Sequence, residues 1–227
     1  MIRRDFILRM IEEMGRALAQ IRALRQSGRV EAAREVVDAE CQKLTAMGVA
    51  GILALSETEL LARVSEGQYS QTVHLRTLAV VAMLGEAGEM ASAKDRTEEA
   101  RAIFLKALDL LLGVLAQDDP AGFPEFVPKV EALVTALQDE PLPAHTLAML
   151  MGHYEGTGQF AKAEDALFAI VEQVGADEKA IGFGRGFYER IPRRSDAALA
   201  AGGLPRSEAE DGFDELNQLR ARGPLDA

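Results

Sequence analysis

The side chains that could hold a metal or carry out catalysis are few and widely spaced in this chain. His74, His145 and His153 are the only histidines. His145 and His153 are eight residues apart, so on one helix they would lie about 80° apart around the axis and two turns along it. A single zinc ion could not bind both without a ligand from a loop, and no His-Glu-x-x-His motif is present. We therefore expect no metal site and no cofactor.

The only cysteine, Cys41, can form neither an intrachain disulfide nor a cluster of thiolate ligands. This usage fits a reducing cytoplasm, and we expect Cys41 to be a small buried apolar residue. No local motif indicates a Ser-His-Asp or Cys-His arrangement, and the many carboxylates are expected on helix surfaces. The sequence therefore favours a protein that is not an enzyme.

The glycine-rich segment GFGRGF, residues 182–187, raises the question of a phosphate-binding loop. Such a loop follows a strand and opens a helix, whereas the preceding residues, ADEKAI, are typical of a helix. We expect these glycines to lie at close contacts between helices.

Arginines cluster around YERIPRRSD in a chain whose formal net charge is −11. Arg185, Arg190, Arg193 and Arg194 could bind carboxylates or phosphates of a partner. The alternative is a solvated turn in which they pair with nearby acidic residues. Because the chain is acidic and lacks a long basic run, nucleic acid is disfavoured as a partner.

All of these residues are expected on or between helices. Aromatic residues make up only 5% of the chain, tryptophan is absent, and alanine, leucine and glutamate are abundant. Apolar periodicity, turn residues and capping boxes at Ser56/Glu59 and Ser207/Glu210 predict an all-α protein of about ten helices. The expected helices cover about 2–26, 29–47, 57–66, 70–93, 97–116, a segment ending near 137, 143–157, 160–174, 177–190 and a last helix after Ser207.

The expected organisation is one helical domain over residues 1–227. Three prolines between Pro120 and Pro128 indicate a joint between two halves near 118–128. The longest apolar runs are far shorter than the roughly 20 residues needed to span a bilayer. The apolar face of the helix at 2–26 is expected to pack on a neighbouring helix, so we expect no membrane association.

A small residue recurs after each of three predicted turns between helices. Ala33, Ala100 and Ala163 follow Gly28, Asp95 and Gly158 and are 67 and 63 residues apart. Two helices can approach closely where such a residue lies between their backbones, with larger side chains filling the adjoining space. In the same register, Gly88, Met151 and Gly184 occupy the corresponding place on the first helix of a pair.

This pattern resembles the tetratricopeptide repeat, a helix pair of about 34 residues. The resemblance implies a right-handed superhelix of antiparallel helix hairpins whose first helices line a concave surface for proteins or peptides. The segments MIRRDFILRMIEE and GGLPRSEAEDG are also similar to a family of uncharacterised bacterial repeat-like proteins, which implies no known activity.

The function favoured by these observations is a non-catalytic protein-binding or assembly module in the bacterial cytoplasm, with a protein partner of unknown identity. The alternative is an enzyme or small-molecule sensor with a pocket between the halves, near Phe123, Phe126, His153 and Tyr154. The first helix is longer than its hairpin partner. Its uncovered apolar residues, expected near Ile2, Phe6 and Met10, favour a homodimer over a monomer.

Overall fold

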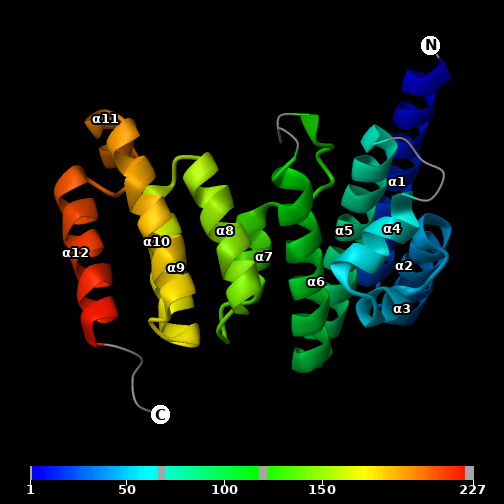
Figure 1. Cartoon of the computed structure of the whole chain (residues 1–227). Coiled ribbons are helices and arrows are strands. Elements are labelled where there is room, and N and C mark those ends of the chain that lie inside the picture. The colour runs from blue at the N-terminus through cyan, green and yellow to red at the C-terminus, as the bar shows by residue number, and fades with distance from the viewer. Residues whose placement is uncertain (1, 66–69, 118–121, 223–227) are drawn as a thin grey trace. The chain divides into compact units, whose positions relative to one another are not determined.

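The computed structural model describes residues 2–65, 70–117 and 122–222, and in these ranges every regular element is helical (Figure 1). They contain twelve α-helices, of which ten have seven or more residues. The predicted all-α fold is therefore confirmed.

The helices belong to two compact units, Met1–Pro141 and Leu142–Ala227. The first contains α1 (Ile2–Gln26), α2 (Val30–Thr45), α3 (Val49–Ala54), α4 (Glu57–Ser65), α5 (Ser70–Ser92), α6 (Thr97–Leu115) and α7 (Val130–Ala136). The second contains α8 (Ala144–Gly156), α9 (Phe160–Val174), α10 (Glu178–Arg190), α11 (Asp196–Ala201) and α12 (Arg206–Arg222). The boundary between the units follows Pro141 in the chain, outside the segment 118–128 where we expected a joint, and residues 118–121 lie outside the described ranges. A single continuous domain stays a prediction.

The core of the first unit lies along α5 and α6, which run side by side (Figure 1). Every residue from 78 to 84 of α5 is buried, as expected for a helix surrounded by others on all sides. In the contact between these two helices, a Cβ atom at Gly88 would lie 2.5 Å from Cε1 of Phe104. Gly88 therefore has the packing role that its position predicted. A Cβ atom added at Gly85 would lie 3.9 Å from Cγ of Pro128, which is an ordinary van der Waals contact.

The second unit packs α8, α9, α10 and α12 around a core that includes Leu167, Phe187 and Leu216, all fully buried. Ala163 has no exposed surface, in line with its predicted place between two helices. A Cβ atom at Gly184 would lie 2.9 Å from Leu167 Cδ1 and 2.8 Å from Leu216 Cδ2. The segment GFGRGF thus lies within α10, and its central glycine permits close helix contacts, as predicted.

The same turn closes three helix hairpins, α1/α2, α5/α6 and α8/α9. In each, one residue is left-handed, and the backbone N–H of the next residue donates to the carbonyl five positions earlier. The left-handed residues are Gly28 (φ 75°), Asp95 (φ 55°) and Gly158 (φ 76°). The following bonds join Arg29 to Leu24, Arg96 to Ala91 and Gln159 to Tyr154, at 2.9, 3.1 and 2.8 Å. The three alanines identified in the sequence therefore stand at equivalent places, five residues beyond equivalent turns.

The two predicted capping boxes have different outcomes. The Ser56/Glu59 capping box is present, because Glu59 accepts the Ser56 N–H at 2.9 Å. The predicted box at Ser207 and Glu210 is wrong. α12 already begins at Arg206, where the carbonyl of Pro205 accepts the Ala209 N–H at 3.0 Å and so starts the helix before Ser207.

Candidate binding sites

The four arginines of the predicted cluster have different surroundings, and one of them, Arg190, forms a structural contact. On α10, Arg190 donates from Nε and Nη2 to the two carboxylate oxygens of Glu155 on α8, each at 2.7 Å. This bidentate bond fixes the guanidinium and raises the pKa of Arg190. For Arg190, pairing with a nearby acidic residue is therefore the correct interpretation. Arg185 is half-buried and Arg193 is exposed.

Arg194 lines a groove around the α8–α9 turn, which we name the turn groove. It has a volume of about 780 Å³ and is lined by residues 155–162, Arg194, Ala198 and residues 201–203. Two of its cations lie over aromatic rings. The guanidinium carbon of Arg194 is 5.7 Å from the ring centre of Phe160, and Lys162 Nζ is 5.3 Å from that of Tyr154. Most of the lining is exposed or half-exposed, so the groove is open to solvent.

The four residues of the alternative pocket belong to different units. His153 and Tyr154 are neighbours on α8, with ring centres 5.7 Å apart, and Tyr154 is buried. Phe123 and Phe126 are in the first unit and are half-buried. A pocket that joins these four residues stays a prediction.

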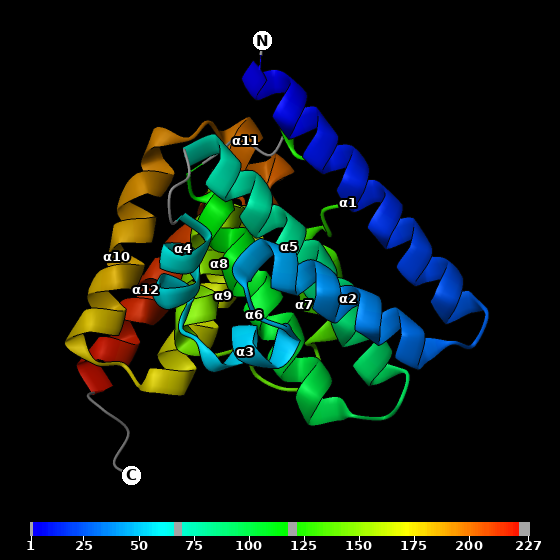
Figure 2. The ribbon, with the colours of Figure 1, turned by 90° about the vertical axis from the view of Figure 1, so that its right-hand side faces the viewer.

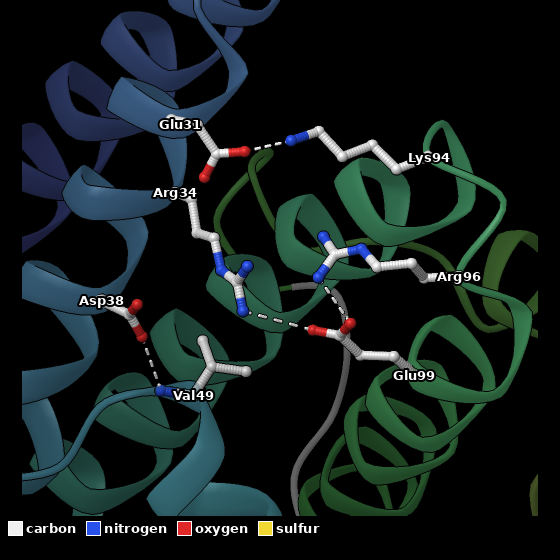
Figure 3. Close-up of polar contacts among 7 residues, drawn as sticks. All are labelled: Glu31, Arg34, Asp38, Val49, Lys94, Arg96 and Glu99. Carbon is white, nitrogen blue, oxygen red and sulfur yellow. Dashed lines mark hydrogen bonds and ion pairs between the residues drawn. The ribbon is translucent and has the colours of Figure 1, made fainter.

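A second site, which the sequence analysis missed, is a cleft in the first unit that we name the arginine cleft (Figure 3). It has a volume of about 340 Å³. Helices α2, α3, α5 and α6 and the α5–α6 turn supply its walls. The lining residues are Arg34, Val37, Asp38, Val49, Ala50, Leu53, Ala87, Met90, Arg96, Glu99 and Ile103.

Two guanidinium groups converge on one carboxylate at the edge of this cleft, as Figure 3 shows. Glu99 Oε2 accepts from Arg96 Nη1 at 2.6 Å, and Glu99 Oε1 is 3.4 Å from Arg34 Nη2. The Nε atom of Arg96 is buried and has no hydrogen-bond partner in the described residues. An unpaired buried donor of this kind carries a desolvation cost of about 1–3 kcal/mol.

The other charged groups around the cleft already have partners. Asp38 accepts the Val49 N–H at 2.9 Å at the start of α3. Lys94 forms an ion pair with Glu31 that lowers the pKa of this exposed carboxyl group. Gly48 permits the approach of Asp38, because a Cβ atom there would lie 2.9 Å from Asp38 Oδ1.

Sequence reasoning missed the arginine cleft because its residues come from segments up to about 70 positions apart. Among the charged residues of the cleft, only the short-range pairs Arg34 with Asp38 and Arg96 with Glu99 have helical spacing. The equivalent turns at Gly28 and Asp95 were the available signal, because they predict that α2 and α6 occupy equivalent positions in two hairpins.

Cys41 is buried, as expected, and burial raises its pKa to about 12. In the ranges that the structure describes, no three His, Cys, Asp or Glu side chains are grouped so that they could hold a metal ion. None of the helices there combines the length and the apolar character required to cross a bilayer.

The structure thus defines an all-helical protein in which a recurring turn joins the two helices of each of three hairpins. The chain belongs to the family of unknown function DUF6483, which it matches over residues 1–221. No curated protein and no solved structure matches it.

Proposed function

We propose that this protein is a non-catalytic protein-binding module of the bacterial cytoplasm, built as a tetratricopeptide-like superhelix. The three equivalent turns support the repeat architecture. Their alanines are 67 and 63 residues apart, close to two repeat lengths of about 34 residues.

The observation that carries the proposed activity is the turn groove with its two cations on aromatic faces. Arg194 and Lys162 are exposed while their side chains lie along Phe160 and Tyr154. Their positions are thereby restrained before a partner arrives, which lowers the entropy lost on binding. The partner segment is an acidic peptide, since its carboxylates would meet these cations in a chain that otherwise repels them.

Charge reversal in the groove tests this function. Pull-downs from the source cytoplasm, followed by mass spectrometry, would compare the wild type with the double variant Lys162→Glu/Arg194→Glu. Arg220→Glu, an exposed position on α12, is the matched control. We expect a recurrent set of proteins with the wild type and the control, enriched in acidic segments, and its loss with the double variant. Recovery of the same proteins with the double variant would refute binding at the turn groove.

The assembly proposed for the chain is a homodimer through α1. Leu8 is 49% exposed, whereas Met14 and Leu18 further along the helix are buried. Figure 2 shows the N-terminal end of α1 extending beyond α2. Met10 is half-buried, and the side chains of Ile2 and Phe6 lie outside the described residues.

Light scattering at several concentrations tests the dimer. We expect twice the chain mass of 24.5 kDa for the wild type and the monomer mass for Leu8→Glu. A monomer mass for the wild type throughout would reject this assembly.

A further inference from the structure

We propose that the arginine cleft of the first unit is a binding site for a small carboxylate with an apolar body of about eight carbon atoms. This site is separate from the turn groove, and the inference does not depend on the proposed protein-binding function.

The polar edge of the cleft has more donors than acceptors. Arg34 and Arg96 together carry ten N–H groups, of which the contacts with Glu99 use two. Three of the four carboxylate oxygens here are already engaged, because both oxygens of Glu99 face guanidinium groups and Asp38 Oδ1 binds the Val49 N–H. A ligand that fits must therefore bring acceptors. A carboxylate matches the planar guanidinium fork in geometry and in charge.

The unpaired Nε of Arg96 indicates where this carboxylate would bind. Glu99 occupies Nη1 and leaves Nε without a partner. A ligand oxygen that hydrogen-bonds Nε would relieve its desolvation cost. Arg34, whose contact with Glu99 is long at 3.4 Å and whose side chain is 48% exposed, is able to turn toward the same oxygen.

The floor of the cleft is apolar and suits the other end of such a ligand. Val37, Met90 and Ile103 are buried there, and Val49 and Leu53 of α3 form a half-exposed wall. The volume of about 340 Å³ corresponds to roughly ten non-hydrogen atoms at the ~30 Å³ that each water occupies in the liquid. Octanoate has this size and carries its charge at one end.

Isothermal titration calorimetry of the full chain with octanoate and with the isosteric neutral octanamide tests the inference. We expect octanoate to bind at least about tenfold more tightly, because only the carboxylate accepts charge-assisted hydrogen bonds. Arg96→Gln and, separately, Arg34→Gln should reduce this preference toward unity. Val49→Phe should weaken both ligands by filling the cleft while keeping the backbone N–H that Asp38 binds.

Arg16→Gln is the matched control, because this exposed arginine bonds only to the backbone of its own helix in the described structure and lies outside the cleft. It should leave both affinities unchanged, and circular dichroism confirms that each variant is folded. The inference is overturned if wild-type protein gives no binding with millimolar octanoate or binds octanamide equally well. It is also overturned if octanoate affinity is the same in Arg96→Gln, Arg34→Gln and Val49→Phe as in the wild type.

Discussion

Two interhelical glutamates, Glu86 in the first unit and Glu164 in the second, have opposite surroundings. Glu86 on α5 is held by two cations of α1, with Arg22 Nε at 2.7 Å and Arg25 Nη1 at 2.5 Å. Glu164 on α9 accepts a hydrogen bond from the Tyr188 hydroxyl at 2.6 Å. Burial raises the pKa of Glu164, and the charges of acidic neighbours raise it further, against the opposing effect of the Tyr188 hydrogen bond.

The comparison teaches that one residue type can either fasten a helix pair through ion pairs or, where its neighbours are acidic, oppose packing when it ionises. Around Glu86 the two arginines offset the carboxylate charge, so these ion pairs stabilise the packing of α1 on α5. Around Glu164 the charged side chains that act on it, Asp165, Glu208 and Glu215, are acidic. Ionisation of this group therefore opposes the packing of the second unit.

The largest expected effect comes from the close helix contacts, which also differ between the units. Gly88→Ala places a Cβ atom within 2.8 Å of three atoms of the rigid Phe104 ring. This overpacking should lower the free energy of unfolding by about 2 kcal/mol, despite the gain in helix propensity. In Gly184→Ala the nearest atoms are the mobile ends of Leu167 and Leu216, so we expect a change within about 1 kcal/mol.

Hydrogen exchange of peptides from α5–α6 and from α9–α10 would measure the two variants unit by unit. Equal losses of protection would show that the two glycine contacts are equally tight and would remove this difference between the units.

A smaller effect is expected when the charge of Glu86 is removed. Glu86→Gln keeps the shape of the side chain but loses two charge-assisted bonds to Arg22 and Arg25. We expect the first unit to lose about 1 kcal/mol, seen as faster exchange in α1 and α5. Glu13→Gln, at an exposed position of α1, is the control and should have no effect. Unchanged exchange in Glu86→Gln would mean that the ion pairs do not fasten these helices.

The next prediction concerns the turns that the two units share. At the left-handed position the α5/α6 turn of the first unit has Asp95 (φ 55°) where the α8/α9 turn of the second has Gly158 (φ 76°). A side chain in this conformation is strained, so Asp95→Gly should stabilise the first unit by about 0.5–1 kcal/mol in urea unfolding. Gly158→Ala, which instead adds a side chain at this position in the second unit, should destabilise it by a similar amount. A loss of stability in Asp95→Gly would show that the aspartate side chain stabilises the turn.

The hairpins were predictable because their signals are local. Apolar periodicity, turn residues and the alanines after Gly28, Asp95 and Gly158 lie within short segments of sequence. Helices α3 and α11 were not predicted, because six residues contain too few turns to show a period. The cap of α11, in which Ser195 accepts the Ala198 N–H at 3.2 Å, was hidden in a segment expected to be irregular.

The candidate sites were less predictable than the fold, because their geometry depends on pairings between distant segments. Residue type identified Arg194 as a candidate, but nothing in the sequence separates it from Arg190, whose partner Glu155 is 35 positions away. Nor does the sequence show that Arg34 and Arg96 face the same carboxylate, since this requires α2 to lie beside the start of α6.

The smallest expected effect at any one pH, and the sharpest test of the comparison, is Glu164→Gln. Because the pKa of Glu164 is raised above its ordinary value of 4.5 in the folded state, the folded protein binds this proton more tightly than the unfolded chain. The contribution of Glu164 to the stability of the folded protein is therefore fully present below about pH 4.5 and is lost as the pH rises through the folded pKa.

Glutamine at position 164 can still accept the Tyr188 hydrogen bond but cannot ionise. Relative to the wild type, Glu164→Gln should thus gain stability in the second unit as the pH rises from about 4.5 to 7, whereas Glu86→Gln loses stability in the first unit at neutral pH. Exchange of α9–α10 peptides at matched intrinsic rates across this range measures the difference. If the difference between Glu164→Gln and wild type stayed constant with pH or had the opposite sign, ionised Glu164 would not oppose packing, and the two glutamates would be alike.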